Sequence, residues 1–588
     1  MQHLPVPPLE HTAKTYLRAV RPLVDDDDAF ARTTSLVADF VASDGPACQA
    51  ELEAFAAQEN GAGRSWLSEA WLAGYLTVRT PVALTTSATL RMRLGDRDAH
   101  PAGRDGGLDW AADAVYRLAS VHLAYLRGEL PAETTPRGEP VCATQREVLA
   151  GGLRHPRADG VDEMRPGDPS PVAREIGVLV EDRYVAAPIS DDAGRPLSRA
   201  QVRALLAAAL REAPSAELVE PGFTIVSSLG SEVAAPLLAE LLTDPGNAAT
   251  YERLTQALFL VRLDEGGDAP VEQLRRGAFE PGQAWAYKTF TYQLGLADGF
   301  AATHMEHTAI DGGTLKAVVE AAQQVPDGAI DPIDPGAGSP RVEPLSWLLT
   351  AQQRDRLARE AARYAQAAAD HRLEVVRVDA PRTDHLSFRV SDDAVQQWLF
   401  LYAQLATYGR IRSTYESVDM RHMQAGRTEC LRAITPEAVA LVSALLPGSA
   451  SSGSAGETDK AALVDAALAA HKSWVQAAKT GHGIDRHLLG LRLAADRLGL
   501  RPALFDDPAL SALGTEFLST TSLGDQSQIS WVAFAPTSPG GIGIYYSLVP
   551  GGYEWLLSHR AGDTESYDAF VENLRAGATA MQELFAAL

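Results

Sequence analysis

The sequence predicts an α/β protein with two similarly built domains. The chain has 588 residues, which is enough for two or more domains with sizeable hydrophobic cores. Stretches with helical apolar spacing alternate with β-branched, strand-like runs in both halves of the chain. Between the halves, residues 326–340 (PDGAIDPIDPGAGSP) are rich in Pro, Gly and Asp, which is typical of a linker.

The first half begins with helices and continues with mixed elements. Apolar spacing predicts helices within residues 7–24, 65–76, 197–213 and 313–325. A β-branched run with a central turn predicts a hairpin at 176–189. A second strand pair turns at Asp298-Gly299 and ends just before His307, whereas the Pro, Gly and Asp residues of 154–170 predict a loop.

The second half repeats this α/β pattern. Strand-like and helical stretches follow one another at 373–378 (strand), 391–410 (helix with a capped start), 458–481 (helix) and 529–559 (β meander). A Gly- and Ser-rich stretch at 447–457 predicts a flexible surface loop, and a last helix closes the chain.

Composition and charge exclude several classes of function. Hydrophobic residues make up 46% and charged residues 22% of the chain, as in ordinary globular proteins. The formal net charge is −24, which disfavours nucleic acids and unaided binding to anionic membranes. Cationic or neutral small molecules are compatible with this charge, whereas an anionic ligand needs a local basic patch.

The cysteines and the ends of the sequence bear on the compartment. Cys48, Cys142 and Cys430 are far apart and odd in number, which disfavours a disulfide scaffold and a zinc site. We find no signal peptide at the N-terminus and no apolar run of transmembrane length. We therefore expect a cytoplasmic protein, and the abundance of Arg and Ala suggests a bacterial genome.

The stretch MEHTAIDGGTL (305–315) is the first candidate site. His304 and His307 are three residues apart, and the HExxH and HxxEH spacings of zinc sites are absent. Taken alone, His307 is compatible with an ordinary strand-end histidine or with a catalytic base. Asp311 lies one turn later and Gly312-Gly313 follow it, and glycines permit a sharp turn and close approach of a substrate. Several acyltransferases that use thioesters share this HxxxDG pattern.

Other stretches extend the pattern over the whole chain. They are LPVPPLEHTAKTYL, SWLSEAWLAGYLTVRTP, MEHTAIDGGTL, STYESVDMRHMQAGRTECLR, GHGIDRHLLGLRL, FLSTTS and SPGGIGIYY, in this order. Together they resemble the carnitine/choline acyltransferase family from about residue 4 to near the C-terminus. The resemblance implies two domains of chloramphenicol-acetyltransferase-like topology with the active-site tunnel between them. Residues 80–345 would carry the catalytic His, and residues 1–79 with 346–588 the acceptor- and CoA-binding motifs.

The resemblance also implies the catalytic residues. His307 matches the family's general base and Asp311 the acid that supports it, so no acyl-enzyme intermediate is expected. Ser519 and Thr521 match hydroxyl donors near the reacting carbonyl, where a donor aimed at a developing oxyanion contributes roughly 3–4 kcal/mol. The family has Ser where this chain has Thr521. A non-catalytic binding module is disfavoured, because it would not need both His307 and Asp311.

The acceptor motifs are of the carnitine type. Tyr415, Ser417 and Thr428 match hydroxyls that bind the carnitine carboxylate, and Arg486 matches an Arg that choline enzymes lack. The stretch GRTE is also the carnitine version. The resemblance therefore implies carnitine, or a carboxylate-bearing analogue, and disfavours choline.

The thioester side departs from the family. Arg382, Arg389 and Asp393 match residues that bind CoA, but Leu386 stands where a second Lys is expected. A weaker site for the 3′-phosphate would favour an acyl-carrier protein as donor. The family stretch NRWFDK reads QAWAYK here, so Ala284 and Tyr287 replace an Arg and an Asp.

Val532 is the best match to a residue that limits acyl length in the family. Its intermediate size predicts short to medium acyl groups. The first hypothesis is a carnitine O-acyltransferase that uses acyl-CoA as co-substrate, with no permanent cofactor or metal, and acts as a monomer. The alternative is a biosynthetic acyltransferase of the same fold that passes an acyl group from CoA or a carrier protein to another alcohol or amine.

Overall fold

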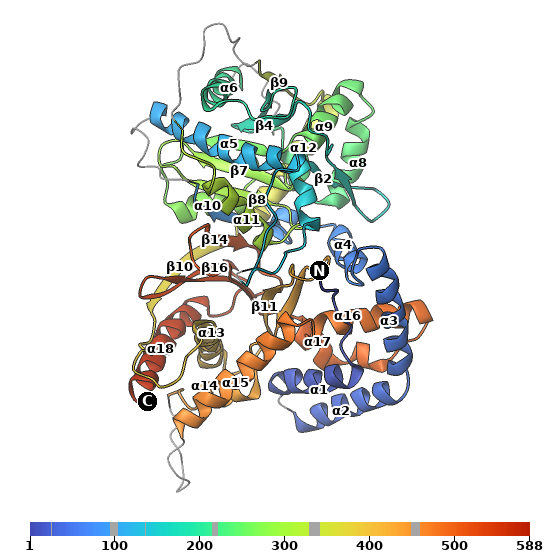
Figure 1. Cartoon of the computed structure of the whole chain (residues 1–588), viewed down its shortest axis with the longest axis vertical. Helices are drawn as coiled ribbons and strands as arrows, with labels where there is room; N and C mark the ends of the chain where they lie inside the picture. Colours follow the sequence, from blue (N-terminus) through green and yellow to red (C-terminus); the bar gives the residue numbers. More distant parts are fainter. Residues whose placement is uncertain (25, 95–103, 136, 214–221, 329–340, 448–458) are drawn as a thin grey trace.

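The protein has two large β-sheets that lie one above the other in Figure 1, which confirms the predicted α/β class with two sheet-containing parts. The computed structural model describes residues 1–588 except 25, 95–103, 136, 214–221, 329–340 and 448–458. The eight-stranded sheet has the order β14 (Ile529–Phe534), β1 (Ala88–Met92), β8 (Ala301–Met305), β7 (Phe290–Gly295), β6 (Leu260–Asp264), β4 (Glu175–Val180), β5 (Arg183–Pro188) and β9 (Glu343–Leu345).

The second sheet has six strands and lies in the lower part of Figure 1. Its order is β10 (His371–Asp379), β16 (Gly552–Arg560), β15 (Ile542–Val549), β13 (Leu518–Thr521), β11 (Thr414–Asp419) and β12 (Thr428–Leu431). In this sheet β13 runs parallel to both of its neighbours, so that Ser519 lies beside Tyr415 and Gly543. The stretches that contain Tyr415 and Ser519 therefore lie in adjacent strands of this sheet.

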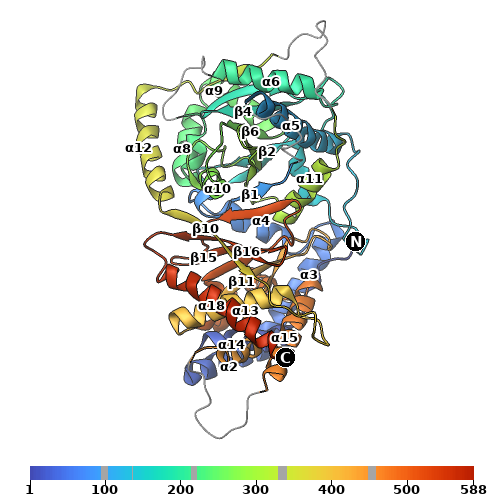
Figure 2. The same cartoon turned by 90° about the vertical axis from the view of Figure 1, so that its left-hand side faces the viewer.

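Helices cover both sheets, and residues of helices and strands together form three hydrophobic cores in the described part of the chain. The helices of the upper part are α5 (Arg104–Leu126), α6 (Arg199–Glu212), α7 (Ile225–Ser228), α8 (Ser231–Leu241), α9 (Pro245–Gln256), α10 (Pro270–Phe279), α11 (Gly312–Gln323) and α12 (Ala351–Ala368). Those packed on the lower sheet are α13 (Asp392–Tyr408), α14 (Pro436–Ser443), α15 (Lys460–Lys479) and α18 (Tyr567–Ala586). Figure 2 shows the same two parts stacked from the side.

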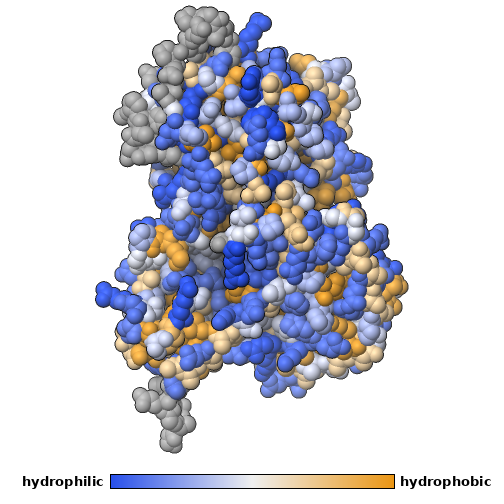
Figure 3. Space-filling model, in the orientation of Figure 1, coloured by the Kyte–Doolittle hydropathy of each residue, from blue (hydrophilic) through white to orange (hydrophobic). Residues whose placement is uncertain are grey.

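The third core joins the beginning of the chain to a segment near its end. It contains α1 (Leu9–Val20), α2 (Asp27–Ala42), α3 (Gly45–Gly61), α16 (Asp485–Leu498) and α17 (Pro508–Gly514). Figure 1 shows these N-terminal helices, in blue, beside the orange α16 and α17. From this bundle α4 (Ser68–Leu76) leads the chain toward the region between the two sheets, where the surface narrows to a waist in Figure 3.

Strand β14 corrects the predicted meander at 529–559. It leaves the second half and pairs antiparallel with β1 of the upper sheet, with Val532 opposite Leu90. Only β15 and β16 form the expected hairpin in the lower sheet. The prediction was wrong because a run of β-branched residues identifies a strand but not its partner. The crossover joins the two halves through main-chain hydrogen bonds.

Most other predicted elements are confirmed. The hairpin at 176–189 turns at Glu181-Asp182, two residues with positive φ, and Gly299 has φ 69° in the turn before β8. The predicted loop at 154–170 is confirmed only in part, because β2 (Gly152–His155) and β3 (Glu163–Pro166) form a small hairpin within it. The strands were not predicted because they contain charged residues, which are partly buried in ion pairs. Most of 326–340 and 447–457 lies outside the described residues.

The structure also bears on the cysteines and on membrane-spanning helices. Cys48, Cys142 and Cys430 are free thiols and all three are buried. In the part of the chain that the structure describes, each helix is too short or too polar to cross a lipid bilayer.

Candidate active site

His307 and Asp311 meet just beyond the end of β8. Their closest atoms, His307 Nδ1 and Asp311 Oδ1, are 3.8 Å apart, and the side chains are 24% and 7% exposed. Between them, Thr308 donates its hydroxyl (2.5 Å) and its main-chain N–H (3.2 Å) to the carboxyl group of Glu306. This turn brings the acid beside the imidazole, as the four-residue spacing indicated.

The carboxylate of Asp311 is held from both halves of the chain. Arg427, directly before β12, donates from Nε to Oδ2 at 2.7 Å and from Nη2 to Oδ1 at 3.0 Å. Gln145 donates from Nε2 to Oδ2 at 2.6 Å. Although burial opposes ionisation, the charges of Arg427 and His307 and these hydrogen bonds lower the pKa of Asp311. Asp311 is therefore a fixed anion beside His307.

Tyr75 of α4 completes the surroundings of His307. Its hydroxyl lies 3.0 Å from His307 Nδ1, and the two rings stack with an angle of 12°. Burial lowers the pKa of His307, and the charge of Asp311 partly opposes this shift. The imidazole is consequently neutral near pH 7. Within the described residues, Nδ1 has these two neighbours and Nε2 has no hydrogen-bond partner.

Gly312 and Gly313 have a different role from the sharp turn that we expected. They form the first residues of α11, and neither has a positive φ. A Cβ atom on Gly313 would lie 2.6 Å from Nη2 of Arg421, whereas one on Gly312 would make ordinary contact with Leu523. Gly313 thus leaves room for Arg421, which belongs to the lower part of the molecule.

His307 opens onto a cavity of about 280 Å³ between the two sheets. The lining includes the predicted residues Asp311, Tyr415, Ser417, Thr428, Ser519, Thr521 and Val532. It also includes Trp71 and Tyr75 of α4 and the stretch 85–88. The structure therefore brings together residues that are hundreds of positions apart in the sequence.

Arg486 lies immediately behind the hydroxyl groups of this cavity. It donates from Nε to the carbonyl of Thr428 at 2.8 Å and from Nη2 to the hydroxyls of Tyr415 (3.2 Å) and Thr428 (3.3 Å). Its guanidinium lies 4.4 Å from the centre of the Trp71 ring. Burial raises the pKa of Tyr415 to about 12, so its hydroxyl remains protonated. These groups form a cationic, hydroxyl-rich corner.

Glu429 lies under the same corner and is 4% exposed. Its Oε1 accepts from the main-chain N–H of Cys430 at 2.7 Å and from that of Arg486 at 3.4 Å. Burial raises the pKa of Glu429 to about 7; the charge of Arg486 opposes this shift and that of Asp485 adds to it. The charge of the corner thus changes close to neutral pH.

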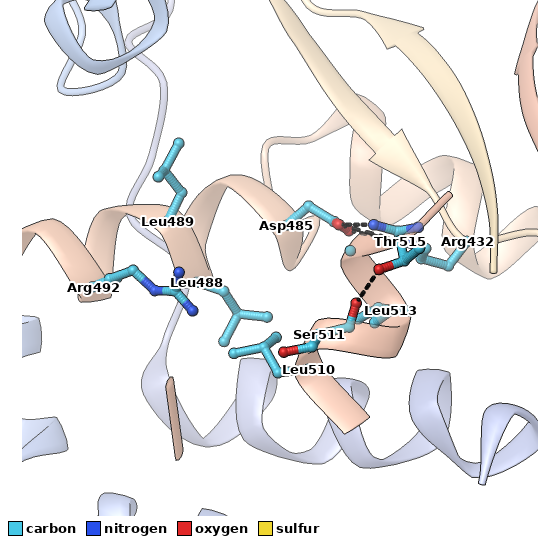
Figure 4. A pocket seen from close by; sticks show the side chains of 10 residues that line it. Arg432, Asp485, Leu488, Leu489, Arg492, Leu510, Ser511, Leu513 and Thr515 are labelled. Atoms are coloured by element: carbon cyan, nitrogen blue, oxygen red, sulfur yellow. Dashed lines mark hydrogen bonds and ion pairs between the residues drawn. The ribbon is translucent and has the colours of Figure 1, made fainter. Parts of the chain in front are cut away.

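A second cavity, of about 350 Å³, lies between α16 and α17 and contains none of the predicted site residues (Figure 4). Its wall includes Arg432 and Asp485, which form an ion pair with each other. Arg432 also donates to the hydroxyl of Ser413 at 2.9 Å, and Arg492 to the carbonyl of Phe505 at 2.9 Å. The ion pair fixes the first turn of α16, which carries the neighbouring Arg486.

Val532 lines the active cavity from β14. The side chain is 6% exposed, and its register partner Leu90 on β1 lines the same cavity. The pairing means that two aliphatic side chains from opposite halves of the chain lie together at this wall. Leu90 was not among the predicted site residues.

The three predicted CoA-binding residues do not form a cluster with the cavity. Arg382 and Arg389 are exposed and do not line it. Asp393 accepts hydrogen bonds from His471 Nε2 (2.8 Å) and from the hydroxyl of Tyr546 (2.7 Å). Leu386, where a Lys was expected, packs against the core of the lower sheet.

Asp393 nevertheless connects to the strands behind the cavity. Tyr546 is also 2.5 Å from Glu416, whose other oxygen accepts from Gln397 at 3.0 Å. Gln397 in turn donates to the hydroxyl of Thr520 at 3.0 Å. Burial and the charge of Asp393 raise the pKa of Glu416 far above its usual value. This network supports β11 and β13, which carry the predicted hydroxyl donors.

Other polar and charged residues lie where the stretch QAWAYK lacks the Arg and the Asp of the family. Tyr287 is buried and its hydroxyl lies 3.0 Å from that of Ser231, which also donates to Asp162. Arg154, which is fully buried, donates from Nε to Asp162 at 2.8 Å. Its Nη1 is 3.6 Å from Glu306, next to His307. A buried charged network therefore backs the active site despite Ala284 and Tyr287.

Besides Leu90, sequence reasoning did not single out Trp71, Tyr75, Gln145 and Arg427. Three of them lie within the stretches that carried the resemblance, SWLSEAWLAGYL and GRTE, so a signal was present there. Gln145 lies outside those stretches. Three residues that line the cavity also carry buried polar atoms, Trp71 Nε1 and the hydroxyls of Thr86 and Ser87, that have no hydrogen-bond partner among the described residues.

Known proteins with similar sequences point to one family. Residues 4–576 match the profile of a family described as Choline/Carnitine o-acyltransferase. The chain is 25% identical over 575 residues to carnitine O-acetyltransferase of Mus musculus, covering 93% of this chain and 87% of the relative. It is 26% identical over 588 residues to mitochondrial carnitine O-palmitoyltransferase 2 of Rattus norvegicus, covering 93% and 86%. It is 25% identical over 610 residues to choline O-acetyltransferase of Rattus norvegicus, covering 99% and 92%.

Solved structures give weaker similarities. The nonribosomal peptide synthetase FmoA3 aligns with a TM-score of 0.36 and 13% identity, covering 88% of this chain and 42% of that one. The starter condensation domain of rhizomide synthetase RzmA aligns with a TM-score of 0.34 and 12% identity, covering 88% and 94%. The family match, in contrast, spans nearly all of the sequence and includes every stretch that builds the cavity. This protein is therefore an acyltransferase, and the chain belongs to the choline/carnitine O-acyltransferase family.

Proposed function

We propose that the protein transfers short- to medium-chain acyl groups between CoA and the hydroxyl of carnitine, with His307 as general base and without an acyl-enzyme. One observation carries the proposal. A neutral imidazole, whose Nε2 has no hydrogen-bond partner among the described residues, opens onto the same cavity as a corner that combines a guanidinium with hydroxyl donors. The first feature suits proton transfer from an alcohol, and the second suits a substrate with a carboxylate.

The reaction follows from these positions. His307 Nε2 removes the proton of the acceptor hydroxyl as its oxygen attacks the thioester carbonyl carbon. The C–S bond of the resulting tetrahedral intermediate then breaks, and the imidazolium returns the proton to the departing thiolate. Ser519 and Thr521, which line the cavity on β13, are suitable donors to the negatively charged oxygen of the intermediate. Asp311 stabilises the imidazolium by its charge.

The acceptor corner favours carnitine over choline. The substrate carboxylate would contact the hydroxyls of Tyr415, Ser417 and Thr428, with the charge of Arg486 directly behind them. Choline has no carboxylate to meet this charge. The aromatic rings of Trp71 and Tyr75 line the same cavity and are suited to a quaternary ammonium group.

For the donor, Arg382 and Arg389 are exposed surface cations suited to a phosphate, and Asp393 is suited to an amide of the pantetheine arm. Thiol release from acetyl-CoA with and without L-carnitine tests the proposal. Carnitine-stimulated release supports it, and no stimulation with any acyl-CoA removes it. Acetyl-phosphopantetheine, which lacks the 3′-phosphate, is the second arm: equal efficiency with both donors would favour a carrier protein.

The acyl length is expected to depend on Val532. We expect wild-type turnover to be higher with acetyl-CoA and hexanoyl-CoA than with palmitoyl-CoA. Val532→Gly removes an aliphatic side chain that faces Leu90 and should raise the hexanoyl-to-acetyl and palmitoyl-to-acetyl ratios by about tenfold, since pocket methylenes discriminate on this scale. The acetyl-CoA rate serves as the internal control. Fastest wild-type turnover with palmitoyl-CoA would contradict the expectation.

The acceptor KM is expected to rise with pH through Glu429. Below pH 7 this buried carboxyl is protonated and neutral; above its pKa of about 7 it adds a negative charge beside Arg486. A bound carboxylate is then repelled, so the carnitine KM should rise about threefold to tenfold from pH 6 to pH 8. Glu429→Gln keeps the oxygen that accepts the two main-chain N–H groups and should flatten the dependence. An unchanged slope in this variant would exclude Glu429 as its source.

A further inference from the structure

Asp311 occupies a helix N-cap but does not cap its helix. It precedes α11, and its side chain makes no hydrogen bond to the N–H groups of the first turn. Of the five other Asp N-caps in the described helices, four accept such bonds: Asp26, Asp244, Asp459 and Asp507. An Asp at this position normally gains stability from capping. Some other contact must therefore turn the carboxylate of Asp311 away.

Gln145 makes contacts that have this effect. This residue of the 3₁₀ helix η4 (Thr144–Ala150) is 4% exposed. Its Nε2 donates to Asp311 Oδ2 at 2.6 Å, and its Oε1 accepts from the main-chain N–H of Asp311 at 2.8 Å. The same oxygen accepts from the hydroxyl of Thr314 at 2.7 Å. The carboxamide of Gln145 thus binds both the side chain and the main-chain N–H of Asp311. It also accepts a hydrogen bond from the hydroxyl of Thr314 in the first turn of α11.

We infer that Gln145 is a positioning residue that keeps the Asp311 carboxylate beside His307 and out of the helix-capping conformation. The inference rests on the proposed role of His307 as base. Gln145 does not line the cavity, so it acts through Asp311 rather than on the substrate.

Arg427 alone does not provide the same constraint. Its guanidinium binds both carboxylate oxygens and also the carbonyls of Thr308 (2.8 Å) and His307 (3.1 Å). However, Arg427 belongs to the lower part of the molecule, so its position relative to His307 depends on how the two parts meet. Gln145 belongs to the same part as His307 and contacts the Asp311 backbone as well. It therefore fixes the acid relative to the base within one part of the chain.

The expected consequence is electrostatic. The charge of Asp311 raises the pKa of His307 against the effect of burial. If the carboxylate moves toward the first turn of α11, this contribution weakens and the pKa of His307 falls. The acid limb of the kcat/KM profile then moves to lower pH, and kcat falls because the imidazolium is less stabilised. A role in stability alone would not move the profile.

Gln145→Met tests the inference, because Met has nearly the same size but cannot make the three hydrogen bonds. We expect kcat to fall about tenfold with the carnitine KM within about twofold, and the acid limb to move to lower pH. Gln145→Glu keeps an acceptor for the Asp311 N–H but places a like charge against its carboxylate. It should lose activity as well, which gives a second variant should Gln145→Met fail to fold.

Gln273→Met is the matched control. Gln273 is also buried, and its Nε2 donates to the carboxylate of Asp298 at 2.6 Å. It should change neither kcat nor the pH profile. Equal losses in both Met variants, or a wild-type profile in Gln145→Met, would overturn the inference.

Titration of His307 by NMR, assigned with a His307 variant, needs no turnover. A lower His307 pKa in Gln145→Met supports the positioning role even if carnitine does not stimulate thiol release in the wild-type enzyme. An unchanged pKa contradicts it. Failure of the inference and failure of the proposed function are therefore distinguishable.

Discussion

Replacement of His307 by Ala should lower kcat by about 10²–10⁴-fold and leave the fold intact, because a positioned general base contributes on this scale. The imidazole is neutral near pH 7, since burial outweighs the charge of Asp311, and in the part of the chain that the structure describes its Nε2 makes no hydrogen bond. Without it, nothing at that position can take the proton of the acceptor hydroxyl. The donors of β13 and the acceptor corner remain, so the KM for carnitine should change much less than kcat.

His155→Ala is the matched control for this experiment. His155 is half-buried in the same half of the chain, and its Nδ1 lies 2.7 Å from the hydroxyl of Tyr251, much as His307 Nδ1 faces Tyr75. Both variants lose a His–Tyr contact, but only one should lose turnover. Thermal unfolding followed by circular dichroism should give similar midpoints for the two proteins. Near-wild-type thiol release by His307→Ala would exclude every mechanism in which it is the base.

Local spacing explains why the centre of the site could be predicted from the sequence. The four-residue separation of His307 and Asp311 after a strand places both side chains at one strand end, and the structure brings them within 3.8 Å. Residues in motifs of the second half, such as Tyr415 and Ser519, reach the same cavity because β11 and β13 are neighbours. The family resemblance implied these two residues as part of the site, whereas the pairing of β11 with β13 is a finding of the structure.

The contacts that fix Asp311 could not be predicted in this way. Gln145 reaches it across 166 positions and Arg427 across 116, and neither distance is encoded in a periodic pattern. The crossover of β14 to the upper sheet could not be predicted either, because strand composition does not specify which sheet a strand joins. Pairing across the two halves depends on the whole fold, whereas spacing within a turn does not.

Arg486→Gln should give the second large effect, on specificity for the acceptor. We expect the carnitine KM to rise by about 10²–10³-fold, because the bound carboxylate of carnitine would lose the buried guanidinium that balances its charge. Removal of the guanidinium also raises the pKa of Glu429, which then stays neutral near pH 7, so the corner loses its positive charge without gaining another. Choline has no carboxylate, so its KM should change far less. The ratio of kcat/KM for carnitine to that for choline should therefore fall.

Arg492→Gln is the matched control, since Arg492 lies on the same helix but on the wall of the other cavity. It should leave both acceptors unchanged. Measurement of kcat and KM separately for L-carnitine and choline distinguishes the possible outcomes. If kcat alone falls in Arg486→Gln, the guanidinium orients the transition state rather than binding the carboxylate. If neither value changes, the acceptor carboxylate binds elsewhere, and the proposal for carnitine loses its main support even though His307 can still act as a base toward another alcohol.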